Sequence, residues 1–150
     1  MATQCKLYTN TPQLIQPQTW TTVRYDEVLR DDAGMFRAAL KVTDRNAALI
    51  TPKRDGDFIW FRFLHWDDIT VPDGDTRPRQ FIERFVRDPY TEPDSTGSAD
   101  TGDTPGKEYR LGSWAFAGHA GQPVAVQVWH DHDQPVAIVH AQFVGMTWDY

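Results

Sequence analysis

Short hydrophobic runs rich in Val, Ile, Phe and Trp recur along this chain, separated by Pro, Gly and Asp clusters at intervals of about ten residues. This spacing leaves little room for helices and is typical of a β-sandwich or β-barrel. A chain of 150 residues is long enough for one domain with its own core. We therefore predict an all-β fold and a single domain over residues 1–150.

The strongest strand signal is the run DFIWFRFLHW at residues 57–66. Both of its alternating faces are apolar, as expected for a central strand that protein covers on each side. The run at 79–86 also fits one face of a helix, but its length and its Phe, Ile and Val content favour a strand. Further strands are predicted at residues 19–25, 111–115, 122–129, 135–140 and 141–148, with turns at 31–34 and 117–121 and a hairpin connection at 131–134.

Residues 89–108 form a Ser, Thr, Gly, Asp and Pro tract without apolar periodicity. Five acidic residues against one lysine place most of the net charge of −6 in this tract. Such a segment cannot offset its ordering entropy by burying apolar surface. We expect a long acidic surface loop over residues 89–108, of the length that is often functional.

The composition excludes several classes of protein. A net charge of −6 argues against a nucleic-acid partner, which normally faces a basic surface. The sequence contains neither a membrane-spanning apolar run nor a signal-peptide pattern after Met1, so we expect no membrane partner. Cys5 is the only cysteine, which excludes an intrachain disulfide and indicates a reducing compartment.

Candidate catalytic and metal-binding residues are few. His130 and His132 lie at i and i+2, so a strand would present both imidazoles to one ion, but no other His or Cys has a spacing that completes a zinc site. Cys5 lies in an N-terminal segment expected to be mobile, and Ser113 lacks a nucleophile-elbow motif. We predict no catalytic residue, no metal and no cofactor, with these two histidines as weak metal candidates.

The six tryptophans have two possible roles. Exposed rings could stack on sugars or anchor a partner, and buried rings would fill a core or a subunit interface. Trp60, Trp66, Trp114 and Trp129 lie in strand-like runs, which favours a core or an interface. The sequence around Trp148 does not indicate whether its ring is buried or exposed.

Taken in order, several segments resemble one known family, the tumour-necrosis-factor-like or complement-head-like jelly rolls, in particular their short versions in bacteria and tailed phages. The resembling segments are the opening strand at 16–26, a D-x-x-G-M turn at 31–36, an I-x-x-P…G-x-Y entry at 48–63, a G-D-x-V-x-V-x-V strand at 121–129 and a closing strand at 143–148. The chain departs from the family at Phe58, which replaces a tyrosine, at the widened gap 53–55 and in the long acidic loop.

The resemblance implies a jelly-roll β-sandwich of about eight to ten antiparallel strands. It also implies a tight homotrimer with aromatic and apolar inner faces, which binds rather than catalyses. A closed trimer would also cover open strand edges. The interface candidates on this basis are Trp20, Tyr25, Trp60, Phe61, Phe63, Trp129, Phe143 and Trp148.

The function expected from this resemblance is that of a structural virion protein of a tailed bacteriophage. It would be a trimeric capsid decoration or tail-associated protein that contacts the major capsid protein or tail proteins, on the surface of a virion assembled in the host cytoplasm. No collagen-like or coiled-coil stalk precedes the head, which favours decoration. Two alternatives stay open: a soluble carbohydrate- or receptor-binding head that recognises a host-surface glycan, and a cupin-like metalloenzyme using His130 and His132.

Overall fold

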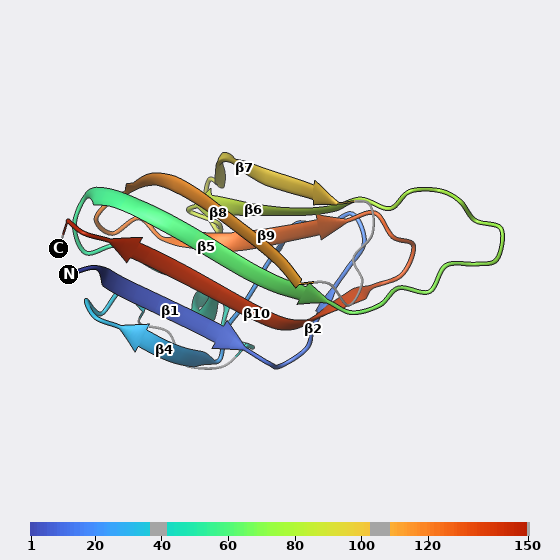
Figure 1. The fold of residues 1–150 in the computed structure, drawn as a ribbon, viewed down its shortest axis with the longest axis horizontal. Helices are drawn as coiled ribbons and strands as arrows, with labels where there is room; N and C mark the ends of the chain where they lie inside the picture. Colours follow the sequence, from blue (N-terminus) through green and yellow to red (C-terminus); the bar gives the residue numbers. More distant parts are fainter. Residues whose placement is uncertain (37–41, 103–108, 150) are drawn as a thin grey trace.

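A computed structural model describes residues 1–36, 42–102 and 109–149 of the chain, with the side chains of 95–102 and 109 left out. Its strands form two antiparallel sheets packed face to face, as Figure 1 shows. The elements are β1 (Thr3–Thr9), β2 (Gln13–Ile15), β3 (Thr21–Thr22), β4 (Glu27–Asp31), the short 3-10 helix η1 (Arg45–Ala48), β5 (Gly56–Trp66), β6 (Phe81–Arg87), β7 (Asp94–Gly102), β8 (Tyr109–Gly118), β9 (Val124–His130) and β10 (Val136–Thr147). The predicted all-β jelly-roll sandwich is confirmed.

One sheet has six strands, ordered β4-β1-β10-β5-β8, with β2 also paired to β10. The other has four strands, ordered β3-β9-β6-β7. β1 and β10 pair from Thr3 opposite Thr147 to Thr9 opposite Ala141, so both ends of the chain lie at one end of the sandwich (Figure 1). In the described part of the chain, no helix is both long and apolar enough to cross a membrane.

The core lies between the two sheets and is rich in aromatic side chains. Trp60 is fully buried and stacks on Phe58, Phe116 and Phe143, with ring centroids 4.8, 5.3 and 5.8 Å apart. Burying a large apolar side chain contributes about 1.5–3 kcal/mol to folding. Buried aromatic side chains therefore help to hold the two sheets together.

The predicted loop at 89–108 is wrong over Asp94–Gly102, which form strand β7. This strand pairs with β6, from Arg87 opposite Asp94 to Phe81 opposite Gly102. β7 is the last strand of its sheet, so it needs one backbone ladder and no apolar alternation, which is why its polar sequence concealed it. Residues 103–108 of the predicted loop lie outside the described residues.

The predicted hairpin at 131–134 is also wrong. β9 and β10 belong to different sheets, so this connection crosses the sandwich. The two strands predicted at 135–140 and 141–148 are one strand, β10, with a register shift between Ile138 and His140. The shift leaves two consecutive residues, Val139 and His140, only partly buried, and this break in the alternation looked like a strand boundary.

The N-terminal segment expected to be mobile is strand β1, paired to β10 on one side and to β4 on the other. Cys5 is buried in it, and burial raises the pKa of its thiol, so the thiol stays protonated. The predicted strand at 19–25 is reduced to the two residues of β3.

A long connection instead joins β5 to β6 over residues 67–80, visible in Figure 1 as the green excursion beyond the strand ends. It contains a turn at Asp73–Asp75, where Gly74 has a positive φ of 80°. Arg79 donates to Asp75 at 2.6 Å, and Arg77 donates to Asp133 in the β9–β10 connection at 2.8 Å. These ion pairs tie the excursion together and to the neighbouring connection.

Candidate self-association face

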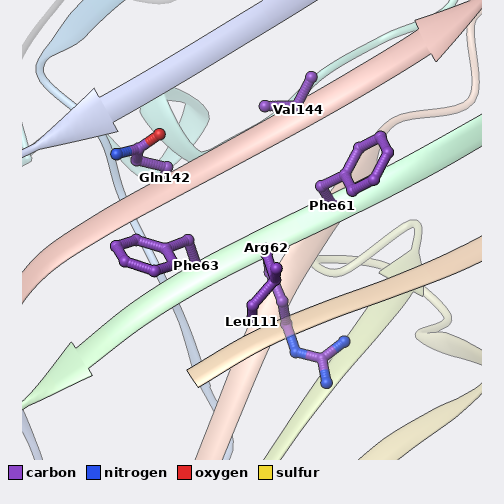
Figure 2. Close-up of a pocket in the computed structure, with 6 residues that line it drawn as sticks. All are labelled: Phe61, Arg62, Phe63, Leu111, Gln142 and Val144. Atoms are coloured by element: carbon purple, nitrogen blue, oxygen red, sulfur yellow. The ribbon is translucent and has the colours of Figure 1, made fainter. Parts of the chain in front are cut away.

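The outer face of the six-stranded sheet carries an unusual amount of apolar surface. β5 was predicted to be covered on both sides, because both of its faces are apolar. Among the described residues, other elements cover only the inward face of β5, and Ile59, Phe61 and Phe63 point outward and are half-buried. Figure 2 shows Phe61 and Phe63 projecting from β5 on the opposite side from Arg62.

Strand register extends this apolar surface onto β10 and β8. Residues that are direct partners in antiparallel strands share a face of the sheet. The outward residues form three rows across β10, β5 and β8. The rows are Met146, Ile59 and Ala115, then Val144, Phe61 and Ser113, then Gln142, Phe63 and Leu111. We call these nine residues the apolar face.

The apolar face is accessible in the single chain. Leu111 on edge strand β8 is 69% exposed. It lines a surface hollow of about 240 Å³ together with Phe61, Phe63, Gln142 and Val144, which Figure 2 shows around it. A leucine so exposed beside two phenylalanines marks a site where apolar surface can be buried by a partner.

The apolar face has a polar border along β1. Gln4, Lys6 and Tyr8 are the outward residues of that strand, opposite Met146, Val144 and Gln142 respectively. Beyond β1, Arg30 of β4 pairs with Lys6. An apolar centre with a polar rim is the usual organisation of a protein–protein interface.

Two histidines close one end of the apolar face, where His140 of β10 pairs with His65 of β5. His140 Nδ1 lies 2.6 Å from Asn10 Oδ1, and its Nε2 lies 3.0 Å from Gln142 Nε2. These partners fit a neutral ring that donates from Nδ1 and accepts at Nε2. Burial lowers the pKa of His140, and the neighbouring His65 lowers it further.

Beneath the apolar face, a buried ionic cluster joins the two sheets. Arg62 Nε of β5 lies 3.3 Å from Glu83 Oε1 of β6, and both side chains are about 1% exposed or less. Glu83 Oε2 accepts a hydrogen bond from Trp66 Nε1 at 3.0 Å and forms an ion pair with Arg110 Nη1 at 3.2 Å. Burial raises the pKa of Glu83, while the guanidinium of Arg110, the Trp66 N–H and Arg62 act in the opposite direction. This cluster fixes β5 and β8 over the opposite sheet.

The predicted interface residues fall into three groups. Phe61 and Phe63 belong to the apolar face. Tyr25, Trp60 and Phe143 are fully buried core residues. Alternation along β5 and β10 turns Trp60 and Phe143 inward, and Tyr25 lies in the connection between β3 and β4.

The other three lie elsewhere. Trp20 is 38% exposed beside β3, Trp129 is half-buried on β9, and Trp148 is 59% exposed just after β10. The sequence pattern did not identify Leu111 and Val144, which share a face of the sheet with Phe61 and Phe63. Their position follows from strand register, which hydrophobic alternation alone does not reveal.

The metal candidates His130 and His132 are engaged within the fold. His130 is fully buried, with Nε2 2.8 Å from the Ile15 carbonyl oxygen and Nδ1 accepting from the His132 N–H at 3.1 Å. Both of its ring nitrogens therefore have protein partners. Among the described residues, no group of three or more His, Cys, Asp and Glu side chains is arranged to hold a metal ion.

No protein-family model matches the chain, and no curated protein matches it in sequence. Solved structures resemble it in three dimensions. The globular domain of zebrafish complement 1qA protein has a TM-score of 0.60 at 12% identity and covers 100% of this chain and 98% of that one. Murine APRIL has a TM-score of 0.61 at 10% identity over 96% and 98% of the two chains. Eiger TNF from S. frugiperda has a TM-score of 0.54 at 10% identity over 98% and 90%.

The chain therefore has the jelly-roll fold that is seen in these tumour-necrosis-factor-like and complement-head domains. At these identities the likeness concerns the fold alone. Function has to be argued from the surfaces of the chain itself.

Proposed function

We propose that this chain is a structural virion protein of a tailed bacteriophage, a homotrimeric capsid decoration or tail-associated protein that binds the particle surface. The observation that carries the proposal is the apolar face on β10, β5 and β8, which the single chain leaves accessible. Burial of that face against two further copies is the role we assign to it.

The trimer is supported by the distribution of polarity across one sheet. Apolar side chains gather at the β8 edge, where Leu111 is 69% exposed, and polar ones gather at β1 and β4. Copies related by a threefold axis would bury the apolar edge and keep the polar edge in water. The resemblance of the sequence to trimeric jelly rolls supports the same arrangement.

The virion role is supported by the resemblance of several segments to short phage jelly rolls. Within the particle, the partner would be the major capsid protein or a tail protein. The proposed activity is binding and assembly, because no candidate catalytic group has emerged in the described part of the chain.

Light scattering with sedimentation velocity tests the trimer, and two exposed leucines of the same sheet provide a matched pair. Leu111 on β8 is 69% exposed and Leu29 on β4 is 55% exposed. We expect a trimer for the unmodified chain and for Leu29→Glu, and a monomer for Leu111→Glu. A monomeric unmodified chain, or a Leu111→Glu variant that remains trimeric, contradicts the proposal.

Mass spectrometry and cryo-EM of purified particles test the virion role. We expect the protein in stoichiometric amounts, with threefold density of matching size on the capsid or tail surface. Its absence from purified particles contradicts this part of the proposal and leaves the trimer to be judged by light scattering.

A further inference from the structure

A second surface, whose lining includes none of the nine residues of the apolar face, has the organisation of a ligand site. It is a groove of about 490 Å³ beside the four-stranded sheet, within the size range of small-molecule sites. Its walls include Trp20, Thr22, Arg24, Pro89, Tyr90 and Gln127. We call it the arginine groove, because Arg24 lines it and two further arginines stack on its aromatic residues.

Two aromatic rings of the arginine groove are each paired with a guanidinium. The Arg84 guanidinium carbon lies 3.6 Å from the centroid of the Trp20 ring, and that of Arg45 lies 4.1 Å from the centroid of Tyr90. The Tyr90 hydroxyl also donates to the Arg45 carbonyl oxygen. Such stacks hold the two rings in place before any ligand arrives.

The polar wall between the rings is held equally firmly. Gln127 Oε1 accepts from Arg84 at 2.7 and 3.1 Å, and its Nε2 donates to Thr22 Oγ1 at 3.2 Å. The Thr22 hydroxyl still has its own proton to donate, and the neighbouring Tyr90 hydroxyl is one partner within its reach. Gln13 of β2 uses both ends of its amide on the backbone of Arg24, which joins β2 to the connection between β3 and β4.

Charge distinguishes this groove from the rest of the molecule. The chain has 21 acidic residues and 15 Lys and Arg, yet none of the described residues lining the groove is acidic. Arg24 lines it, and Nη1 of this residue donates to the carbonyl oxygens of Val42 and Thr43 at 3.1 Å. The Arg24 side chain also interacts with the Tyr90 hydroxyl, and because a guanidinium has five N–H donors, these partners still leave donors for an anion.

We propose that the arginine groove binds a carboxylate-bearing sugar residue. The Trp20 ring provides the stacking surface for the apolar side of a pyranose, as tryptophan does for ligands with one apolar face. Thr22 provides a hydroxyl partner, and the Arg24 guanidinium pairs with the carboxylate. An anion without a ring would not use Trp20, and a neutral sugar would bond Arg24 only through hydroxyl oxygens, which form weaker hydrogen bonds with a guanidinium than a carboxylate does.

The proposal is tested by titrating the full chain with oligosaccharides containing glucuronic, galacturonic or N-acetylneuraminic acid, each beside its neutral methyl ester, and reading binding by saturation-transfer NMR and calorimetry. We expect at least one acid to bind at least tenfold more tightly than its ester. High salt should weaken binding of the acid and leave the ester unchanged. No binding by any acid, or equal binding of acid and ester, overturns the proposal.

Variants locate the site. Trp20→Ala should weaken binding of the acid at least tenfold, and Trp148→Ala, a control at an exposed tryptophan elsewhere, should leave it unchanged. Arg24→Gln should reduce the preference for acid over ester, and the salt dependence of the unmodified chain tests the same point if that variant unfolds. Unchanged binding by Trp20→Ala overturns the site. The test is independent of the proposed trimer, which light scattering judges separately.

Discussion

Gly112 of β8 lies directly over the guanidinium of Arg62, its partner on β5. A Cβ atom on Gly112 would come within 2.3 Å of Arg62 Cζ. The absence of a side chain at Gly112 is therefore what lets Arg62 turn inward and reach Glu83 on the opposite sheet. One glycine on an edge strand thus leaves the space through which this arginine reaches its carboxylate.

Replacing Gly112 with alanine should displace Arg62 from Glu83. Breaking a buried ion pair costs about 3–5 kcal/mol, because a charge is left without compensation. In urea denaturation, we expect the free energy of unfolding of Gly112→Ala to be about 3 kcal/mol lower than that of the unmodified chain. Ser113→Ala, the next residue on the same strand but pointing outward, should change it by less than about 0.5 kcal/mol. Equal stability of the two variants would show that Arg62 can relocate at no cost.

Removing the charge of Glu83 should be similarly costly, since Glu83→Gln leaves the guanidinium of Arg62 buried without its counter-ion. We expect a loss of about 3–5 kcal/mol, against less than about 0.5 kcal/mol for exposed Glu27→Gln. The double variant Arg62→Met with Glu83→Leu should be more stable than Glu83→Gln, because it removes both buried charges. A double variant less stable than the single one would mean that the pair itself contributes net stability.

Much of the fold was predictable because alternation and turn chemistry report local structure. The core strand at 57–66 and the strand at 79–86 appeared with nearly correct bounds, since their inward residues are large and apolar. Strand β7 was missed because an edge strand needs no apolar face. The crossing from β9 to β10 was misread because alternation does not say which strands pair.

The site was only partly predictable for the same reason. Phe61 and Phe63 were recognised as interface candidates, but Trp60 and Phe143 were grouped with them although they face inward. Strand register decides which aromatic residues point inward. The same register places Leu111 beside Phe63 and Val144 beside Phe61. The arginine groove joins segments from 13 to 127 and left no local motif at all.

Tyr25 offers a stabilising substitution. Its ring is fully buried, and its hydroxyl has no hydrogen-bond partner among the described residues. A buried polar group without a partner costs about 1–3 kcal/mol. We therefore expect Tyr25→Phe to raise the free energy of unfolding by about 1 kcal/mol, whereas Tyr8→Phe at the half-buried outer face should not raise it. A loss of stability in Tyr25→Phe would show that the hydroxyl is bonded in solution.

Acid should destabilise this protein through His130. Burial lowers its pKa below the ordinary value of 6.5, and the bond to the Ile15 carbonyl only partly opposes this. Its Nδ1 accepts the His132 N–H, so a proton on Nδ1 would place two donors face to face. The folded chain then binds fewer protons than the unfolded chain, and stability rises with pH in this range.

This contribution is fully present above about pH 6.5 and is lost as the pH falls through the lowered pKa of the folded state. The lowered pKa values of Asp32 and Asp75 lie below 3.8, so their effect appears only in much stronger acid. Urea unfolding at pH values from about 8 to 5 should show a decline that begins near 6.5. His130→Gln should be less stable at pH 8 but decline less steeply, while exposed His119→Gln should follow the unmodified chain. Performing the series in the Leu111→Glu background separates folding from self-association. If the free energy of unfolding of His130→Gln falls with decreasing pH as steeply as that of the unmodified chain, another group causes the acid response. The first candidate is His140, whose pKa is also lowered.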